Sequence, residues 1–278
     1  MNESIVLSSS RTQATEAFTP IAGPEAETDA VALRVESHPG MFALKRFGAQ
    51  MLRQPLDPVQ RRLFFASTAE FFREVPGGIL ALALRLTDDW MPHERFGAVE
   101  KGAQILYSAV DEFGLHQLKR GVQASHHAFF LETAAAFGVG RSDLDEAAAI
   151  TQAAREMAAL TALFYRRRPV GESLGFHLAS ELTSDVEFTL CLEGFQAHAA
   201  AYGLTGPDDP KLGFYLIHTQ VEPMHGSTSR TAVCDYLARR PECAAEIAAG
   251  AEAFMDAYGR FFSALTERIS APSLRKVA

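Results

Sequence analysis

The sequence lacks most of the features that mark secreted proteins. It has only three cysteines in 278 residues, and Cys191, Cys234 and Cys243 do not have the spacing of a metal-binding or redox pair. A sparse and odd number of cysteines excludes a disulfide scaffold and fits a reducing compartment. The first residues contain no cationic segment followed by a long apolar run, so they do not resemble a secretory signal.

Long apolar runs and basic clusters are also missing. No stretch of about 18 apolar residues could cross a bilayer. The 26 Lys and Arg are interspersed with 34 Asp and Glu, which gives a net charge of -8. The sequence therefore indicates neither a nucleic-acid partner nor a membrane partner. These absences together predict a soluble, cytoplasmic protein.

The sequence does contain a succession of helical patterns. Hydrophobic residues make up 47% of the chain, which is typical of a globular protein. Residues 1–30 are rich in Ser, Thr, Ala, Glu and Pro without hydrophobic periodicity, and we expect a mobile N-terminal arm there. Residues 31–278 have apolar positions at helical spacing and no strand alternation. We therefore predict a single compact all-α domain of about seven to nine helices.

Local signals predict where several helices begin. Asp57 is a suitable N-cap for the helix that follows it. Ser142 is expected to cap a helix over 144–165. Residues 172–202 and 211–240 have the pattern of one long helix each.

The sharpest chemical pattern lies in the last of these segments. His218, Glu222 and His225 have the spacing His-x3-Glu-x2-His. A helix turns about 100° per residue, so the three side chains project from one stripe. Imidazole nitrogens and carboxylate oxygens are ligands that suit iron, manganese or zinc. Pro223 and Gly226 lie beside them and predict a kinked or labile helix at this point.

This stripe has three interpretations: a metal site, a hydrogen-bonded structural cluster, or a polar face toward water. The residues around the motif, from Phe214 to Met224, are apolar on nearly every side, which predicts burial. Buried imidazoles and a buried carboxylate need partners, and one cation satisfies all three together. We therefore favour a metal, and most simply iron in an oxygen-activating enzyme.

Three ligands from one helix rarely complete a metal site, so we expect others on facing helices. Glu181 lies in a long predicted helix, Glu112 near the end of another, and His126 at the start of a buried segment. Taken alone, a buried Glu is more often an ion-pair or capping residue than a ligand. Helix pattern alone also leaves open the choice between Glu112 and Asp111, and between His126 and His127.

In this combination the chain resembles the haem-oxygenase-like di-iron oxidases. These helical proteins hold a pair of irons with carboxylates and histidines instead of haem. Their last core helix carries His-x3-Asp/Glu-x2-His, which His218, Glu222 and His225 match. The resemblance extends over about residues 38–265 and implies a haem-oxygenase-like helical bundle.

Earlier segments match the same family. An acid that follows a Leu-Gly pair corresponds to Glu181. An acid followed by a His, ahead of a Leu/Phe-rich helix, corresponds to Glu112 and His126. This register favours these two residues over Asp111 and His127.

The resemblance implies that six residues bind the metal and serve catalysis. It further implies two Fe(II) per chain and O2 as co-substrate. The substrate would be a small amino-acid-like or fatty-acid-like molecule that undergoes N-oxygenation, desaturation or oxidative carbon–carbon cleavage in specialised metabolism. An external electron donor and a homodimer are compatible with this chemistry. The six residues are Glu112, His126, Glu181, His218, Glu222 and His225.

Other charged residues have weaker assignments. Asp185 and Glu187 are expected to hydrogen-bond ligand histidines or to lie at the surface. Arg95, Lys119 and Arg230 could each pair with a substrate carboxylate, although a solvated surface position is the simpler expectation for each.

Two rival classes use a helical scaffold without iron. A metal-free thiaminase-like or quinone-forming enzyme would need a nucleophile or a cluster of bases, and Cys191 and Cys234 have no recognisable partners. A non-enzymatic helical interaction protein would leave the buried histidines unexplained. The sequence thus favours a non-haem di-iron oxidoreductase over these two alternatives.

Overall fold

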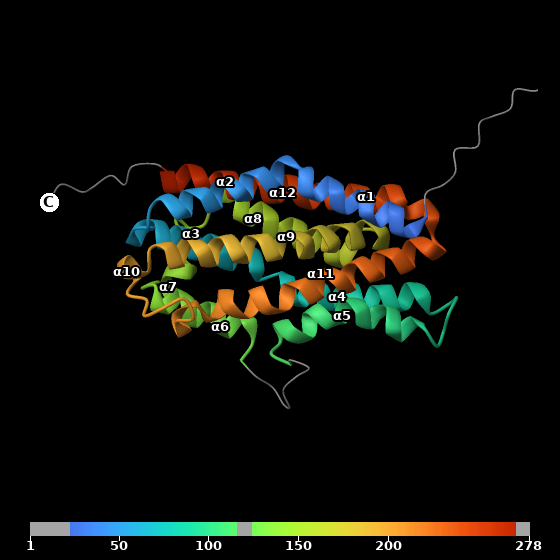
Figure 1. The fold of residues 1–278 in the computed structure, drawn as a ribbon. Helices are drawn as coiled ribbons and strands as arrows, with labels where there is room; N and C mark the ends of the chain where they lie inside the picture. The colour runs from blue at the N-terminus through green and yellow to red at the C-terminus, as the bar shows by residue number, and fades with distance from the viewer. Residues whose placement is uncertain (1–22, 116–123, 271–278) are drawn as a thin grey trace, which may run out of the picture.

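The computed structural model describes residues 23–115 and 124–270, and these contain twelve α-helices and no strands. This confirms the all-α prediction (Figure 1). None of the described helices is long and apolar enough to cross a bilayer. The helices are α1 (Pro24–Ser37), α2 (Pro39–Arg53), α3 (Pro58–Phe72), α4 (Val75–Trp90), α5 (Ala98–Glu112), α6 (His126–Ala136), α7 (Arg141–Leu144), α8 (Gln152–Arg167), α9 (Val170–Ala197), α10 (Ala199–Tyr202), α11 (Gly213–Arg239) and α12 (Ala244–Ser270).

The longest helix, α9, runs through the middle of an elongated bundle (Figure 1). In this view α1, α2 and α12 lie above α9, and α11 lies below it with α4, α5 and α6. Helix α9 packs against α2, α11 and α12, while α11 also contacts α5 and α6. The segments that carry the predicted site residues therefore meet at the middle of the bundle.

Two glycines let α9 and α12 approach each other closely. A Cβ atom placed on Gly175 would lie 1.9 Å from the carbonyl oxygen of Ile247. One placed on Gly250 would lie 1.9 Å from the carbonyl oxygen of Glu172. Since no side chain fits in either gap, only glycine permits this crossing. The crossing fixes the N-terminal half of α9.

The N-terminal region is more structured than the sequence predicted. We expected a mobile arm over 1–30, but α1 begins at Pro24 and buries Val31 and Val35 against the bundle. Of its buried residues, only Thr28 lies within the expected arm, so the apolar pattern begins at the start of the expected domain. The rest of the expected arm, residues 1–22, lies outside the described residues.

The predicted N-caps had different outcomes. Asp57 accepts hydrogen bonds from the backbone N–H groups of Val59 and Gln60, so its predicted role is confirmed. The prediction for Ser142 was wrong. Helix α8 is capped by Thr151, whose hydroxyl accepts a hydrogen bond from the backbone N–H of Ala154.

A tertiary contact explains where α8 begins. The backbone N–H of Thr151 donates a hydrogen bond of 3.0 Å to the hydroxyl of Ser67 on α3. This contact anchors the chain at the first turn of α8, and Ser142 belongs instead to the four-residue α7. The number of helices exceeds the predicted seven to nine because α1 and α7 had not been expected and the helix predicted over 172–202 is divided into α9 and α10.

Candidate metal centre

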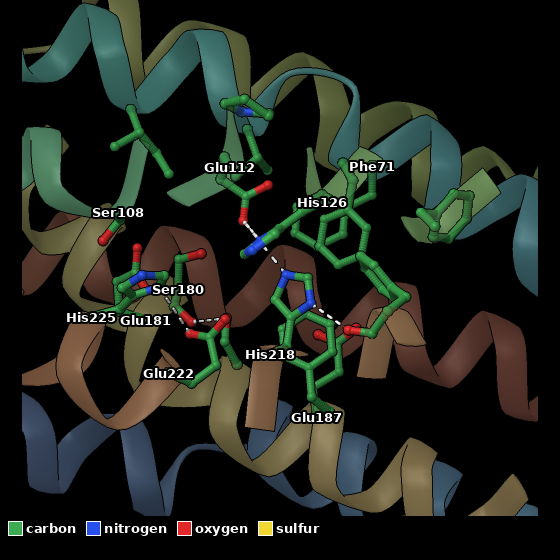
Figure 2. Close-up of a pocket in the computed structure, with 18 of the residues that line it drawn as sticks. Phe71, Ser108, Glu112, His126, Ser180, Glu181, Glu187, His218, Glu222 and His225 are labelled. Carbon is green, nitrogen blue, oxygen red and sulfur yellow. Dashed lines mark hydrogen bonds and ion pairs between the residues drawn. The ribbon is translucent and has the colours of Figure 1, made fainter. Parts of the chain in front are cut away.

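Four helices bring the six predicted residues to one cavity inside the bundle, with a volume of about 60 Å³ (Figure 2). Glu112 ends α5, His126 begins α6 and Glu181 lies within α9. The other three residues follow one another along α11. All six line the cavity: Glu112, His126, Glu181, His218, Glu222 and His225.

The first group consists of Glu112, His126 and His218, whose candidate ligand atoms lie within 4.8 Å of one another. The Nδ1 atom of His126 is 2.9 Å from Oε1 of Glu112, and Nε2 of His218 is 3.5 Å from the same oxygen. Nδ1 of His218 donates a hydrogen bond of 2.7 Å to the carbonyl oxygen of Phe214. This bond orients the imidazole ring so that Nε2 faces the carboxylate of Glu112.

The second group consists of Glu181, Glu222 and His225, again with candidate ligand atoms within 4.8 Å of one another. Nδ1 of His225 lies 3.7 Å from Glu181 and 3.6 Å from Glu222. Nε2 of His225 donates a hydrogen bond of 3.0 Å to Asp111. The ring therefore presents Nδ1 to the two carboxylates.

The electrostatics of the second group indicate that positive charge is needed. Burial, together with Glu222 and Glu112, raises the pKa of Glu181 to about 8 against the opposing effect of His225. Burial alone would lower the pKa of His225, but its hydrogen bond to Asp111 and the nearby carboxylates raise it to about 11. The buried Oε2 atom of Glu222 has no hydrogen-bond partner among the described residues. Clustered carboxylates of this kind are costly unless a cation compensates them.

The donor set fits iron. Each group offers three side chains, and together they offer three carboxylates and three imidazoles without a thiolate. Nitrogen and oxygen donors of this kind, with positions left open, suit Fe(II) sites that react with oxygen. The residues therefore fit one divalent iron in each group.

Asp111 is a site residue that the sequence analysis set aside. It precedes Glu112 on α5, is 4% exposed and accepts the hydrogen bond from His225 described above. Consecutive residues on a helix point about 100° apart. Asp111 and Glu112 can therefore contact different histidines. The sequence analysis chose between the two acids, whereas both belong to the site.

We expect Asp111→Asn to weaken iron binding by roughly 10- to 100-fold, the usual effect of losing a carboxylate behind a ligand histidine. The amide keeps the shape of the side chain but lacks the charge that orients and polarises His225. Anaerobic Fe(II) titration would measure the effect. Asp185→Asn is the matched control because Asp185 is exposed on α9. Unchanged affinity in Asp111→Asn would contradict the orienting role.

His177 is a second residue that sequence reasoning did not assign. It lies one turn before Glu181, with Nδ1 3.5 Å from Oε1 of that carboxylate. Its two ring nitrogens also lie 3.1 Å from the hydroxyls of Tyr165 and Ser229. Burial, with a contribution from His225, lowers the pKa of His177 to about 3, so the ring is neutral. His177 thus links the second group to α8 and α11.

The structure supports the weaker assignments of charged residues to different degrees. Asp185 is exposed, whereas Glu187 is buried and accepts a hydrogen bond from Tyr258 and not from a histidine. Arg230 pairs with Asp29. Neither Arg230 nor the exposed Arg95 lines the cavity, and Lys119 lies outside the described residues.

Cys191, one of the two cysteines considered as a nucleophile for the metal-free alternative, is not activated. Cys191 is 1% exposed, and burial raises the pKa of its thiol well above the usual range. A buried thiol with a raised pKa is a poor nucleophile. The described structure therefore gives no support to Cys191 as a catalytic nucleophile.

Helix α11 continues from Gly213 to Arg239 with Pro223 inside it, and the kink or lability predicted there stays a prediction. We expect Gly226→Ala to stabilise the metal-free protein by about 0.5–1 kcal/mol, the usual cost of glycine in a helix interior. A Cβ atom would meet nothing closer than the carbonyl oxygen of Glu181, at 4.0 Å. Urea unfolding would measure the change, with Gly206→Ala in a loop as the control. A loss of stability would show that α11 needs glycine here.

Part of the chain matches a known protein family, and a known enzyme is similar to most of the chain. Residues 100–259 match the family described as iron-containing redox enzymes, and this segment includes all six residues. A 4-chloro-allylglycine synthase of Streptantibioticus cattleyicolor is 23% identical over 251 residues, which cover 90% of this chain and 87% of the relative.

Two solved structures from Nostoc punctiforme, both of a CADD-like protein of unknown function, have the same fold. One, at 2.00 Å resolution, has a TM-score of 0.64 and 18% identity, and the match covers 89% of this chain and 99% of that one. The other, at 1.35 Å resolution, has a TM-score of 0.65 and 20% identity, with 88% and 95% covered.

Proposed function

This chain belongs to the family of iron-containing redox enzymes, and we propose that it uses O2 to oxidise a small molecule at a non-haem di-iron centre. The observation that carries the proposal is the pair of three-residue groups within one cavity, each with its candidate ligand atoms within 4.8 Å of one another. Two adjacent groups of this composition are well suited to two irons that act together on one substrate.

The proposal assigns one iron to each group. Glu112, His126 and His218 would hold the first, while the second would be held by Glu181, Glu222 and His225. An Fe(II) pair, when bound, supplies the redox chemistry that allows O2 to oxidise an organic molecule.

The other residues of the chain position these side chains and limit access of water. Asp111 orients His225, and the carbonyl oxygen of Phe214 orients His218. The ring of Phe188 stacks on His218 with a centroid distance of 4.0 Å, and Phe130 lines the same cavity. Apolar walls of this kind exclude water and favour a small, partly apolar substrate.

The range of substrates follows from the family and from the name of one relative. The relative from Streptantibioticus cattleyicolor is named for the synthesis of an amino acid, 4-chloro-allylglycine. We propose an amino-acid-like or fatty-acid-like substrate for this chain. The reaction would be N-oxygenation, desaturation or oxidative carbon–carbon cleavage, with electrons supplied where needed by an external donor.

A turnover screen tests this proposal. The protein is loaded with Fe(II) without oxygen, mixed with panels of amino acids and fatty acids, and then exposed to O2. Mass spectrometry should detect the loss of two hydrogens for desaturation, the gain of oxygen for oxygenation, or shorter fragments for cleavage. The product should be absent when iron or O2 is omitted. Equal product formation without iron would contradict the proposal.

A further inference from the structure

A buried carboxylate in the cavity has no assigned part in the candidate metal centre. Glu187 lies on α9, is 6% exposed and lines the cavity together with the six site residues (Figure 2). Its Oε2 atom accepts a hydrogen bond of 2.6 Å from the hydroxyl of Tyr258 on α12. Among the described residues, no Lys, Arg or His forms an ion pair with Glu187. The carboxylate is therefore held in place by a tyrosine hydroxyl and not by an ion pair with a described residue.

Glu187 does not belong to either group of the candidate centre. It is absent from both sets of closely spaced ligand atoms. His218 is the histidine whose charge acts on Glu187, but its two ring nitrogens face the carbonyl oxygen of Phe214 and the carboxylate of Glu112. Glu187 thus orients no histidine among the described residues, and its place in the cavity calls for another explanation.

When the charges of the cavity are counted, the negative charge of Glu187 is left uncompensated. Two divalent irons would be balanced by the carboxylates of Glu112, Glu181 and Glu222 together with Asp111 behind His225. Among the described residues that line the cavity, there is no Lys or Arg to balance a fifth carboxylate. Burial, with a contribution from Glu222, raises the pKa of Glu187 to about 7 despite the hydrogen bond from Tyr258 and the charge of His218, which reflects the cost of a buried negative charge. A cationic ligand would remove that cost.

We infer that Glu187, held by Tyr258, binds an ammonium group of the substrate. This inference rests on the proposed function and narrows its substrate class to small amines. The apolar part of the amine would lie against Phe72, Phe188 and Phe254, which also line the cavity. A fatty acid offers only a carboxylate, which Glu187 repels and which no Lys or Arg among the described lining residues attracts.

The position of Glu187 also limits the length of the substrate. Glu181 and Glu187 are six residues apart on α9, which corresponds to about 9 Å along the helix axis. Ser184 lines the cavity between them. An ammonium group at Glu187 would therefore place the carbons a few bonds away beside the two groups of the centre.

Binding of simple amines tests the inference without any turnover. The probes are n-alkylammonium ions from propyl to hexyl, each compared with the alcohol and the carboxylate of the same chain length. Calorimetric titrations use the anaerobic iron-loaded protein and, in parallel, the metal-free protein. We expect ammonium ions to bind roughly tenfold or more tightly than the matching alcohols, as a charged hydrogen bond provides. Glu187→Gln should reduce that preference to about twofold or less.

Two variants serve as controls. Ser184→Ala removes a neutral polar group of the same cavity and should preserve the preference. Tyr258→Phe keeps the carboxylate and should weaken ammonium binding by less than Glu187→Gln does. Since the amide of Glu187→Gln can still accept the hydrogen bond from Tyr258, the fold should be retained, and circular dichroism checks this. The comparison of ammonium ions with alcohols in the wild-type protein does not depend on the folding of any variant.

The outcomes separate this inference from the proposed function. Equal binding of ammonium ions and alcohols by the wild type would overturn the inference. A preference that persists in Glu187→Gln would do the same, because the amine would then bind iron or another carboxylate. If iron is taken up normally in either case, the proposed function stands. If no iron is taken up but the preference depends on Glu187 in the metal-free protein, the proposed function fails and the ammonium site is supported.

Discussion

Replacing His218 by Ala is expected to lower the iron content from about two ions per chain to about one, and to reduce oxygen-dependent turnover by more than roughly 100-fold. His218 belongs to the group with Glu112 and His126, whereas the group of Glu181 is complete without it. His225→Ala should likewise remove the other iron. Metal analysis after anaerobic loading gives the iron content, and the turnover screen gives the activity.

The matched control for this prediction is His127→Ala. His127 is the exposed neighbour of His126 and does not belong to either group. Its replacement should leave the iron content at the wild-type value, while His126→Ala should behave like His218→Ala. Full iron content and activity in His218→Ala would contradict the assignment of the first group. Loss of iron in His127→Ala but not in His126→Ala would show that the wrong histidine was chosen.

Replacing Gly250 by Ala is expected to destabilise the protein by about 3 kcal/mol or more, the upper range for overpacking a tight contact. The new Cβ atom would lie 1.9 Å from the carbonyl oxygen of Glu172, which is backbone and has no rotamer by which to move away. Helices α9 and α12 must separate to admit it. The midpoint of urea unfolding should therefore fall sharply. Gly175→Ala should have a similar effect on the same crossing.

The control for this steric argument is Gly213→Ala. There the new Cβ atom would meet Phe129 at 3.6 Å, an ordinary van der Waals contact. Its unfolding midpoint should stay close to that of the wild type. Because α9 also carries Glu181, Gly250→Ala should lower the affinity for iron as well. An unchanged midpoint in Gly250→Ala would contradict the account of the α9–α12 crossing.

The fold was largely predictable because helical periodicity is a local property of sequence. The stripe of His218, Glu222 and His225 could be placed on one helix face from spacing alone, and it lies buried as the apolar neighbours predicted. The start of α8 could not be predicted, since it depends on the contact between Thr151 and Ser67, which lie far apart in the chain.

The candidate site shows the same difference between features that depend on local sequence and features that depend on distant contacts. Spacing alone left the choice of Glu112 and His126 open, and resemblance to a family was needed to select them. The structure brings both residues to His218. The roles of Asp111, His177 and Glu187 depend on partners from other helices, so sequence periodicity could not reveal them.

Anaerobic titration of the metal-free wild-type protein with Fe(II), followed by dialysis and metal analysis, tests the central claim most directly. The six residues form two groups, each suited to one iron. The account predicts that binding saturates at about two irons per chain, and that O2 uptake on exposure to air requires both. Saturation at one iron or none, or O2 uptake that does not depend on iron, would contradict it.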